Sequence, residues 1–162
     1  MSIKYIEETF NIEESDLSFK KLVENAPLEI ASTLKGKSVL ILPSHGHEDV
    51  YYAGTLDTLD FLNENGIYTD VYASDDEYRE LGLHGAEIWL GTFIIQSVIV
   101  PIFCGVVSSY IYDKLKAKND DNIALRFMVE NKKGKTTAVE FKGKVENLDK
   151  ALDAIKSFSD ED

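Results

Sequence analysis

The sequence predicts an α+β fold, and three segments carry that prediction. Residues 123–129 and 137–141 alternate apolar and polar side chains around a turn at Gly134, as in an antiparallel β-hairpin with one buried face. Residues 38–73 read as strand, helix and strand with short connections, which makes a βαβ unit. Residues 88–112 carry no formal charge and predict a central apolar helix that contains a proline.

Composition restricts the class of protein. The 162 residues suffice for one domain or two small lobes sharing a core, and we divide them into an N-terminal α/β lobe, 1–83, and a C-terminal part, 84–162, that ends in an amphipathic helix over 145–158. The formal net charge of −12 would repel a phosphate backbone, so we expect no nucleic-acid partner. Cys104 is the only cysteine, which suits a reducing, cytoplasmic location. Its apolar helical surroundings predict an inert core thiol.

The first elements are predicted by capping residues and helix breakers. A weak alternation over residues 2–10 predicts a short edge strand. Ser18 is placed to cap a short helix, and Pro27 suits the first turn of a second helix that ends at Gly36. The run 38–42 is almost wholly apolar, as expected of a strand covered on both faces.

The rest of the βαβ unit follows in order. Residues 50–62 predict an amphipathic helix, and residues 67–73 predict a strand parallel to the one before it. Ser74 and Glu77 form the pattern of a capping box, which predicts another short helix ending at Gly82.

The uncharged segment 88–112 is long enough to cross a bilayer. Pro101 divides it into two pieces of about a dozen residues, a normal size for helices of globular proteins. Beyond Pro101 the apolar residues keep a helical spacing through Leu115, past the charge at Asp113 where a span would end. We therefore expect a helix bent at Pro101 that packs on the hairpin, and a single-span membrane protein is the alternative.

The residues whose side chains are best suited to bind a ligand or a metal lie in one loop between a predicted strand and a predicted helix. At such a position, free backbone N–H groups and the helix dipole favour bound ligands. The candidate ligand-binding residues are Ser44, His45, Gly46, His47 and Asp49. The side chains of His45, His47 and Asp49 alternate with spacers and could converge on zinc or another divalent metal. Paired histidines in a polar loop are also common on plain surfaces, so we assign no catalytic residue.

This loop resembles the H-x-H-x-D-H metal-binding signature of the metallo-β-lactamase superfamily, with Val50 in place of the last histidine. The resemblance covers residues 39–73 and implies a metal- or small-ligand-binding, hydrolase-like domain. The same segment is similar to the opening of TIR-like domains through Ser44, Asp49 and the strand that starts after Gly66. We carry no catalytic residue over from that family.

From Gly82 onward the chain has an apolar segment with several glycines, a helix end reading Tyr-Asp-Lys-Leu, a hairpin with a Lys-Gly turn, and a helix. This order is similar to that of the small effector-associated component proteins encoded beside bacterial conflict and antiphage systems. The resemblance implies a non-enzymatic accessory or adaptor protein that contacts a protein partner or effector. We therefore expect a cytoplasmic adaptor, with the hydrolase-like domain and the membrane protein as alternatives.

Overall fold

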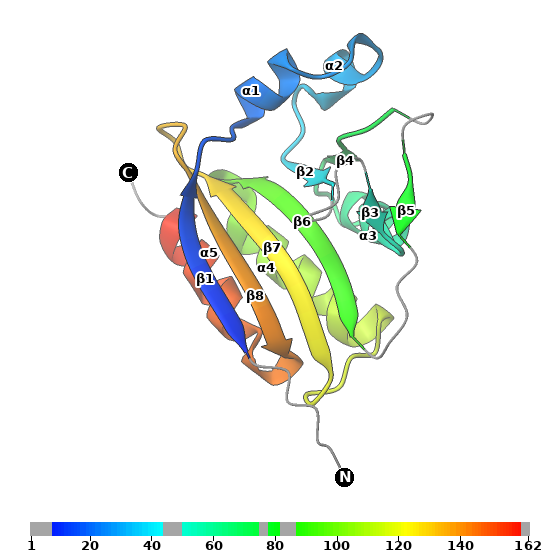
Figure 1. Ribbon diagram of the computed structural model, residues 1–162, viewed down its shortest axis with the longest axis vertical. Helices are drawn as coiled ribbons and strands as arrows, with labels where there is room; N and C mark the ends of the chain where they lie inside the picture. The colour runs from blue at the N-terminus through cyan, green and yellow to red at the C-terminus, as the bar shows by residue number, and fades with distance from the viewer. Residues whose placement is uncertain (1–7, 44–49, 75–77, 82–86, 160–162) are drawn as a thin grey trace.

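The computed structural model describes residues 8–43, 50–74, 78–81 and 87–159. A six-stranded mixed sheet with the order β1-β8-β7-β6-β2-β4 forms its centre (Figure 1). β7 runs parallel to β6 and β4 parallel to β2, while the other neighbours are antiparallel. The strands of this sheet are β1 (Thr9–Ser15), β2 (Val39–Leu42), β4 (Thr69–Val71), β6 (Ile88–Gln96), β7 (Asn122–Glu130) and β8 (Thr136–Lys144). The fold is therefore α+β, as predicted.

Helices cover the two faces of the sheet unequally. The helices are α1 (Phe19–Glu24), α2 (Leu28–Leu34), α3 (Thr55–Glu64), α4 (Val100–Ser109) and α5 (Asp149–Ser159). Figure 1 shows α4 and α5 behind the long strands, and they share one buried cluster with α3. α1 and α2 pack over one end of the opposite face, where Phe19 and Leu34 meet Leu40 and Met128. Farther along that face lie Arg126, Glu140 and Lys142, together with Trp89, whose ring is covered by Lys142.

Three phenylalanines form the centre of the larger core. Phe93 of β6, Phe103 of α4 and Phe127 of β7 are fully buried, and their ring centroids lie 5.2–6.0 Å apart. Edge-to-face contacts of this kind add to the stabilisation from area burial. The hairpin thus buries its inner face against the central segment, which supplies both a neighbouring strand and the helix above it.

Several predicted elements are confirmed. β7 and β8 form the hairpin, whose turn at Gly134 has φ +83°. The parallel pair β2 and β4 is joined through α3, and α5 is the C-terminal amphipathic helix. Ser18 caps α1 by accepting a hydrogen bond from the Lys21 N–H at 3.1 Å. Both parts of the chain, 1–83 and 84–162, contribute strands to this one sheet.

The prediction for residues 88–112 is correct only after Pro101. Residues 88–96 form β6 instead of a helix, because they lie between β2 and β7 with both faces of the strand covered. A strand buried on both faces is apolar throughout, and its pattern is the same as that of a buried helix. Pro101 stands in the first turn of α4 and causes no bend, since a proline there loses no helical hydrogen bond.

The short segments around α3 also differ from the prediction. Tyr51–Tyr52 form β3, a strand parallel to β5 (Glu80–Leu81). We had predicted both segments to be helical. Gly54, with φ +92°, is the N-cap of α3, so the helix begins only at Thr55. β1 begins at Thr9, and residues 2–7 of the predicted strand lie outside the described residues, as do Glu77 and Gly82 of the predicted capping-box helix. Two-residue strands are set by tertiary contacts and leave little periodicity in a sequence.

No helix in the described ranges combines the length and the apolar character that a membrane crossing requires. The segment predicted as the alternative span is a strand followed by a helix of ten residues.

Candidate functional site: the outer face of α4 and the pocket at its end

The predicted ligand-binding loop, with Ser44, His45, Gly46, His47 and Asp49, lies outside the described residues. Among the residues that the structure does describe, no group of three His, Cys, Asp or Glu side chains is close enough to hold a metal ion. The zinc site at the loop therefore stays a prediction. Metal content tests it, comparing protein purified without a histidine tag with the His45→Ala/His47→Ala variant. A metal-free wild type would refute it.

α4 presents two different sides. Its inner side packs against the sheet and α5, and carries Val100, Phe103, Cys104 and Val107, all buried. Because no charged residue occurs between Glu87 and Asp113, the side that faces water is uncharged as well.

We call the following exposed residues the α4 outer face: Pro101, Ile102 and Gly105 of α4, Val98 in the short 3₁₀ turn before the helix, and Tyr112 in the turn after it. Val98 keeps 76% of its surface exposed and Ile102 keeps 54%. Within α4 the spacing of three and four residues places Pro101, Ile102 and Gly105 on one side of the helix. Contiguous exposed apolar residues of this kind mark interaction sites more often than single ones do.

Gly105 stands out within the α4 outer face. A Cβ atom added to it would meet nothing within 4 Å. Glycine in a helix interior is about 1 kcal/mol less favourable than alanine. No contact among the described residues therefore requires glycine here.

Cys104 points into the core between α4 and α5. Its Sγ atom lies 3.9 Å from the carbonyl oxygen of Leu152, and burial raises the pKa of the thiol to about 11. The thiol stays protonated near neutral pH and has little nucleophilic character. The predicted inert core cysteine is confirmed.

A wide turn, Tyr110–Lys114, follows α4 directly. Its backbone forms a π-helical hydrogen bond, in which the N–H of Leu115 donates to the carbonyl oxygen of Tyr110 at 2.9 Å. Lys116, two residues after the turn, has φ +53°, a conformation that side-chain-bearing residues rarely adopt. Closure over five residues brings Tyr110 and Leu115 to the same side of the chain. Single π-helical turns are frequent at functional sites.

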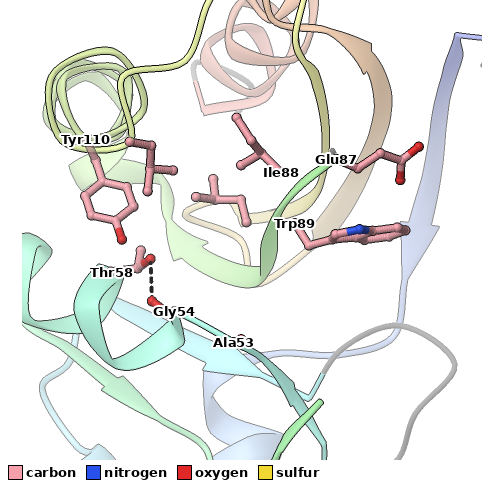
Figure 2. Close-up of a pocket in the computed structure, with 9 residues that line it drawn as sticks. Ala53, Gly54, Thr58, Glu87, Ile88, Trp89 and Tyr110 are labelled. Carbon is pink, nitrogen blue, oxygen red and sulfur yellow. Dashed lines mark hydrogen bonds between the residues drawn. The ribbon is translucent and has the colours of Figure 1, made fainter. Parts of the chain in front are cut away.

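A pocket of about 240 Å³ lies between this turn, the start of β6 and the first turn of α3 (Figure 2). Ile88, Leu90 and Leu115 give it apolar walls, and Ala53 and Gly54 line the side formed by the start of α3. These lining residues come from three separate stretches of the chain, 53–58, 87–90 and 110–115.

One end of the pocket carries hydroxyl groups. The Thr58 hydroxyl donates to the Gly54 carbonyl oxygen at 3.1 Å and is hydrogen-bonded to the Tyr110 side chain. Figure 2 shows the Tyr110 hydroxyl directed towards Thr58. Burial raises the pKa of Tyr110 above its usual value, so the phenol is neutral near pH 7.

The opposite end holds Glu87 and Trp89, which lie away from Tyr110 in Figure 2. Lys142 places its Nζ atom 3.8 Å from a Glu87 carboxylate oxygen and 5.4 Å from the centroid of the Trp89 ring. The ring of Tyr52 packs on Trp89 with a centroid distance of 5.1 Å. Among the described residues that line the pocket, the one carboxylate is therefore balanced by a lysine.

Sequence reasoning assigned none of the pocket residues to a site. The one signal in the sequence that bears on the pocket is the Tyr-Asp-Lys-Leu helix end, which we used for a family resemblance. Neither a family model, nor a curated protein, nor a solved structure matches this chain.

Proposed function

We propose that this protein is a non-enzymatic accessory protein that works by docking the α4 outer face against a partner protein. The observation that carries the proposal is the exposure of Val98 and Ile102 on a helix side without a charged residue. A partner that covers these side chains would remove apolar surface from water, at roughly 25 cal/mol per Å².

Gly105 supports helix docking in particular. Without a Cβ atom, it lets another backbone approach α4 closely, as small residues do between packed helices. The partner surface that fits best is therefore a helix with apolar side chains that straddle Gly105.

The resemblance of the C-terminal half to effector-associated component proteins supports a more specific role. On that reading the partner is an effector in a bacterial antiphage or conflict system, and the chain works in the cytoplasm. The candidate partners are then the products of the genes next to this one.

The test is a binding measurement with purified candidate partners, one at a time. We expect Ile102→Asp and Val98→Asp each to weaken binding at least tenfold, because the interface would bury a carboxylate that no positive charge or hydrogen bond compensates. Leu28→Asp is the matched control, since Leu28 is 92% exposed on α2 and lies on the opposite face of the sheet. All three variants should unfold at about the same urea concentration as the wild type.

Two results would contradict the proposal. A partner that binds Ile102→Asp as tightly as it binds the wild type does not use the α4 outer face. Sedimentation could instead reveal a wild-type dimer that becomes monomeric in Ile102→Asp. In that case the surface serves self-association and the accessory role fails.

A further inference from the structure

We infer that the pocket between α3, β6 and the turn after α4 binds a small uncharged molecule with an apolar body and one hydroxyl group, such as an aromatic alcohol. The inference goes beyond the docking function and does not depend on it. It rests on the size of the pocket, its lining and its charge.

The size of the pocket suits a ligand of about one ring. Its volume is about 240 Å³, and it is partly open to solvent. An aliphatic cavity of about 150 Å³ holds a benzene molecule, so a single ring with a short substituent fits here.

The lining determines the polarity of the ligand. Ile88, Leu90 and Leu115 offer aliphatic contacts to a ring. The Thr58 hydroxyl uses its single proton in the bond to the Gly54 carbonyl, so it can accept a hydrogen bond from a ligand. The Tyr110 hydroxyl, which is directed towards Thr58, is the second polar group at that end. A ligand with one hydroxyl group, which can both donate and accept, therefore matches the site.

Charge argues for a neutral ligand. Glu87 is paired with Lys142, and the Tyr110 phenol keeps its proton. The chain as a whole has a formal charge of −12, which disfavours the approach of anions. None of the described residues that line the pocket carries a positive charge to compensate a carboxylate or a phosphate.

The π-helical turn is an independent indication. The turn brings both Tyr110 and Leu115 to the pocket, and its exit at Lys116 has an unfavourable backbone conformation. Strained backbone next to a concave site is a recurring feature of binding sites. The turn therefore forms one wall of the pocket.

The test is a titration of the full chain with benzyl alcohol, followed by ¹H–¹⁵N NMR. We expect saturable shifts of the Gly54, Thr58 and Leu90 amide signals, with a dissociation constant on the order of 1–10 mM for so small a ligand. The Gly134 signal, from the hairpin turn, should not move. Toluene, which lacks the hydroxyl group, should bind about fivefold more weakly, the ratio that one neutral hydrogen bond provides. Benzoate should give no saturable shift.

Two variants separate recognition from folding. Tyr110→Phe should lose the preference for benzyl alcohol over toluene and keep toluene binding. Leu115→Trp should fill the pocket and weaken both ligands at least tenfold, with a dispersed spectrum as proof of folding. Four results would each overturn the inference. The shifts with benzyl alcohol could fail to saturate, or Leu115→Trp could bind it as tightly as the wild type does. The wild type could also bind toluene as tightly as benzyl alcohol, or bind benzoate saturably. Because no partner protein takes part, failure here leaves the docking proposal standing, and the reverse also holds.

Discussion

α4 and α5 cover the same face of the sheet, and they differ on the side that faces water (Figure 1). α5 exposes Lys150, Asp153 and Lys156 above a buried side of alanine, leucine and isoleucine. α4 buries its inner side equally well, yet its outer face holds no charged residue. α5 thus follows the usual pattern of an amphipathic surface helix, and α4 does not.

The difference separates what the fold needs from what it does not need. Packing against the sheet explains the inner sides of both helices. It leaves Val98, Ile102 and Gly105 of the α4 outer face unexplained, because charged or alanine side chains there would suit a water-facing helix better. Residues that folding does not require are the best candidates for binding, which is why we place docking on α4 and not on α5.

Alanine substitutions on the two sides of each helix should give the largest contrast. Phe103→Ala should lower the free energy of unfolding by about 3–5 kcal/mol, because it opens a cavity between two other phenylalanine rings. Ile102→Ala, one residue away, should cost less than about 1 kcal/mol. Ile155→Ala and Lys156→Ala should show the same split in α5. Urea unfolding measures all four, and a large loss in Ile102→Ala would mean that the outer face of α4 is covered within the chain.

The parts of the fold that the sequence predicts well are the elements with one solvent-exposed side and one buried side. The β7–β8 hairpin and α5 alternate apolar and polar residues at the period of their structure, so their type could be inferred. The apolar residues after Pro101 keep a helical spacing, which identified α4, whereas β6 is almost wholly apolar, so periodicity cannot distinguish this strand from a buried helix. Trp89, Phe93 and Ile94 favour a strand by propensity, and that signal could have corrected the prediction for 88–96.

The pocket was not predictable for a different reason. Its lining comes from three stretches that are brought together only when β3 and α3 pack beside β6, and none of the stretches carries a motif. The histidine loop, which does carry a motif, lies outside the described residues and stays a prediction. For the α4 outer face, the sequence shows that the segment carries no charge. It does not show that these residues are exposed, because exposure depends on which elements pack against the helix.

The interface between α4 and α5 should weaken at high pH through Cys104. Burial raises the pKa of this thiol from an ordinary value of 9.0 to about 11. Below pH 9 the thiol is protonated in both the folded and the unfolded chain, and its contribution to stability is fully present. As the pH rises towards 11, only the unfolded chain releases the proton, so about 2 kcal/mol is lost, half of it by pH 10. Unfolding free energies of wild type and Cys104→Ala at pH 8 and pH 10 measure this, and equal pH dependence in both would contradict it.

Gly105→Ala should sharpen the contrast between folding and binding. The added methyl group has free space and suits a helix, so the free energy of unfolding should rise by just under 1 kcal/mol. Docking of a partner helix should weaken, because the closest approach of the two backbones is lost. Gly134→Ala is the control, since its φ of +83° makes the same chemical change destabilising by about 1 kcal/mol. A Gly105→Ala variant that is more stable and binds as well as wild type would remove Gly105 from the docking surface.

The smallest effect concerns how α4 ends. Lys116 has φ +53°, which costs a side-chain-bearing residue about 1 kcal/mol, and α5 has no such residue in its described part. Lys116→Gly removes this cost, but glycine also raises the conformational entropy of the unfolded chain and so offsets part of the effect. We therefore expect the free energy of unfolding to rise by about 0.5 kcal/mol. Lys118→Gly removes the same charge from the same exposed loop without positive φ and should destabilise by a similar amount. Urea midpoints that shift in opposite directions would show that the wide turn at the end of α4 is held against a local backbone preference, and a shared direction would show that it is not.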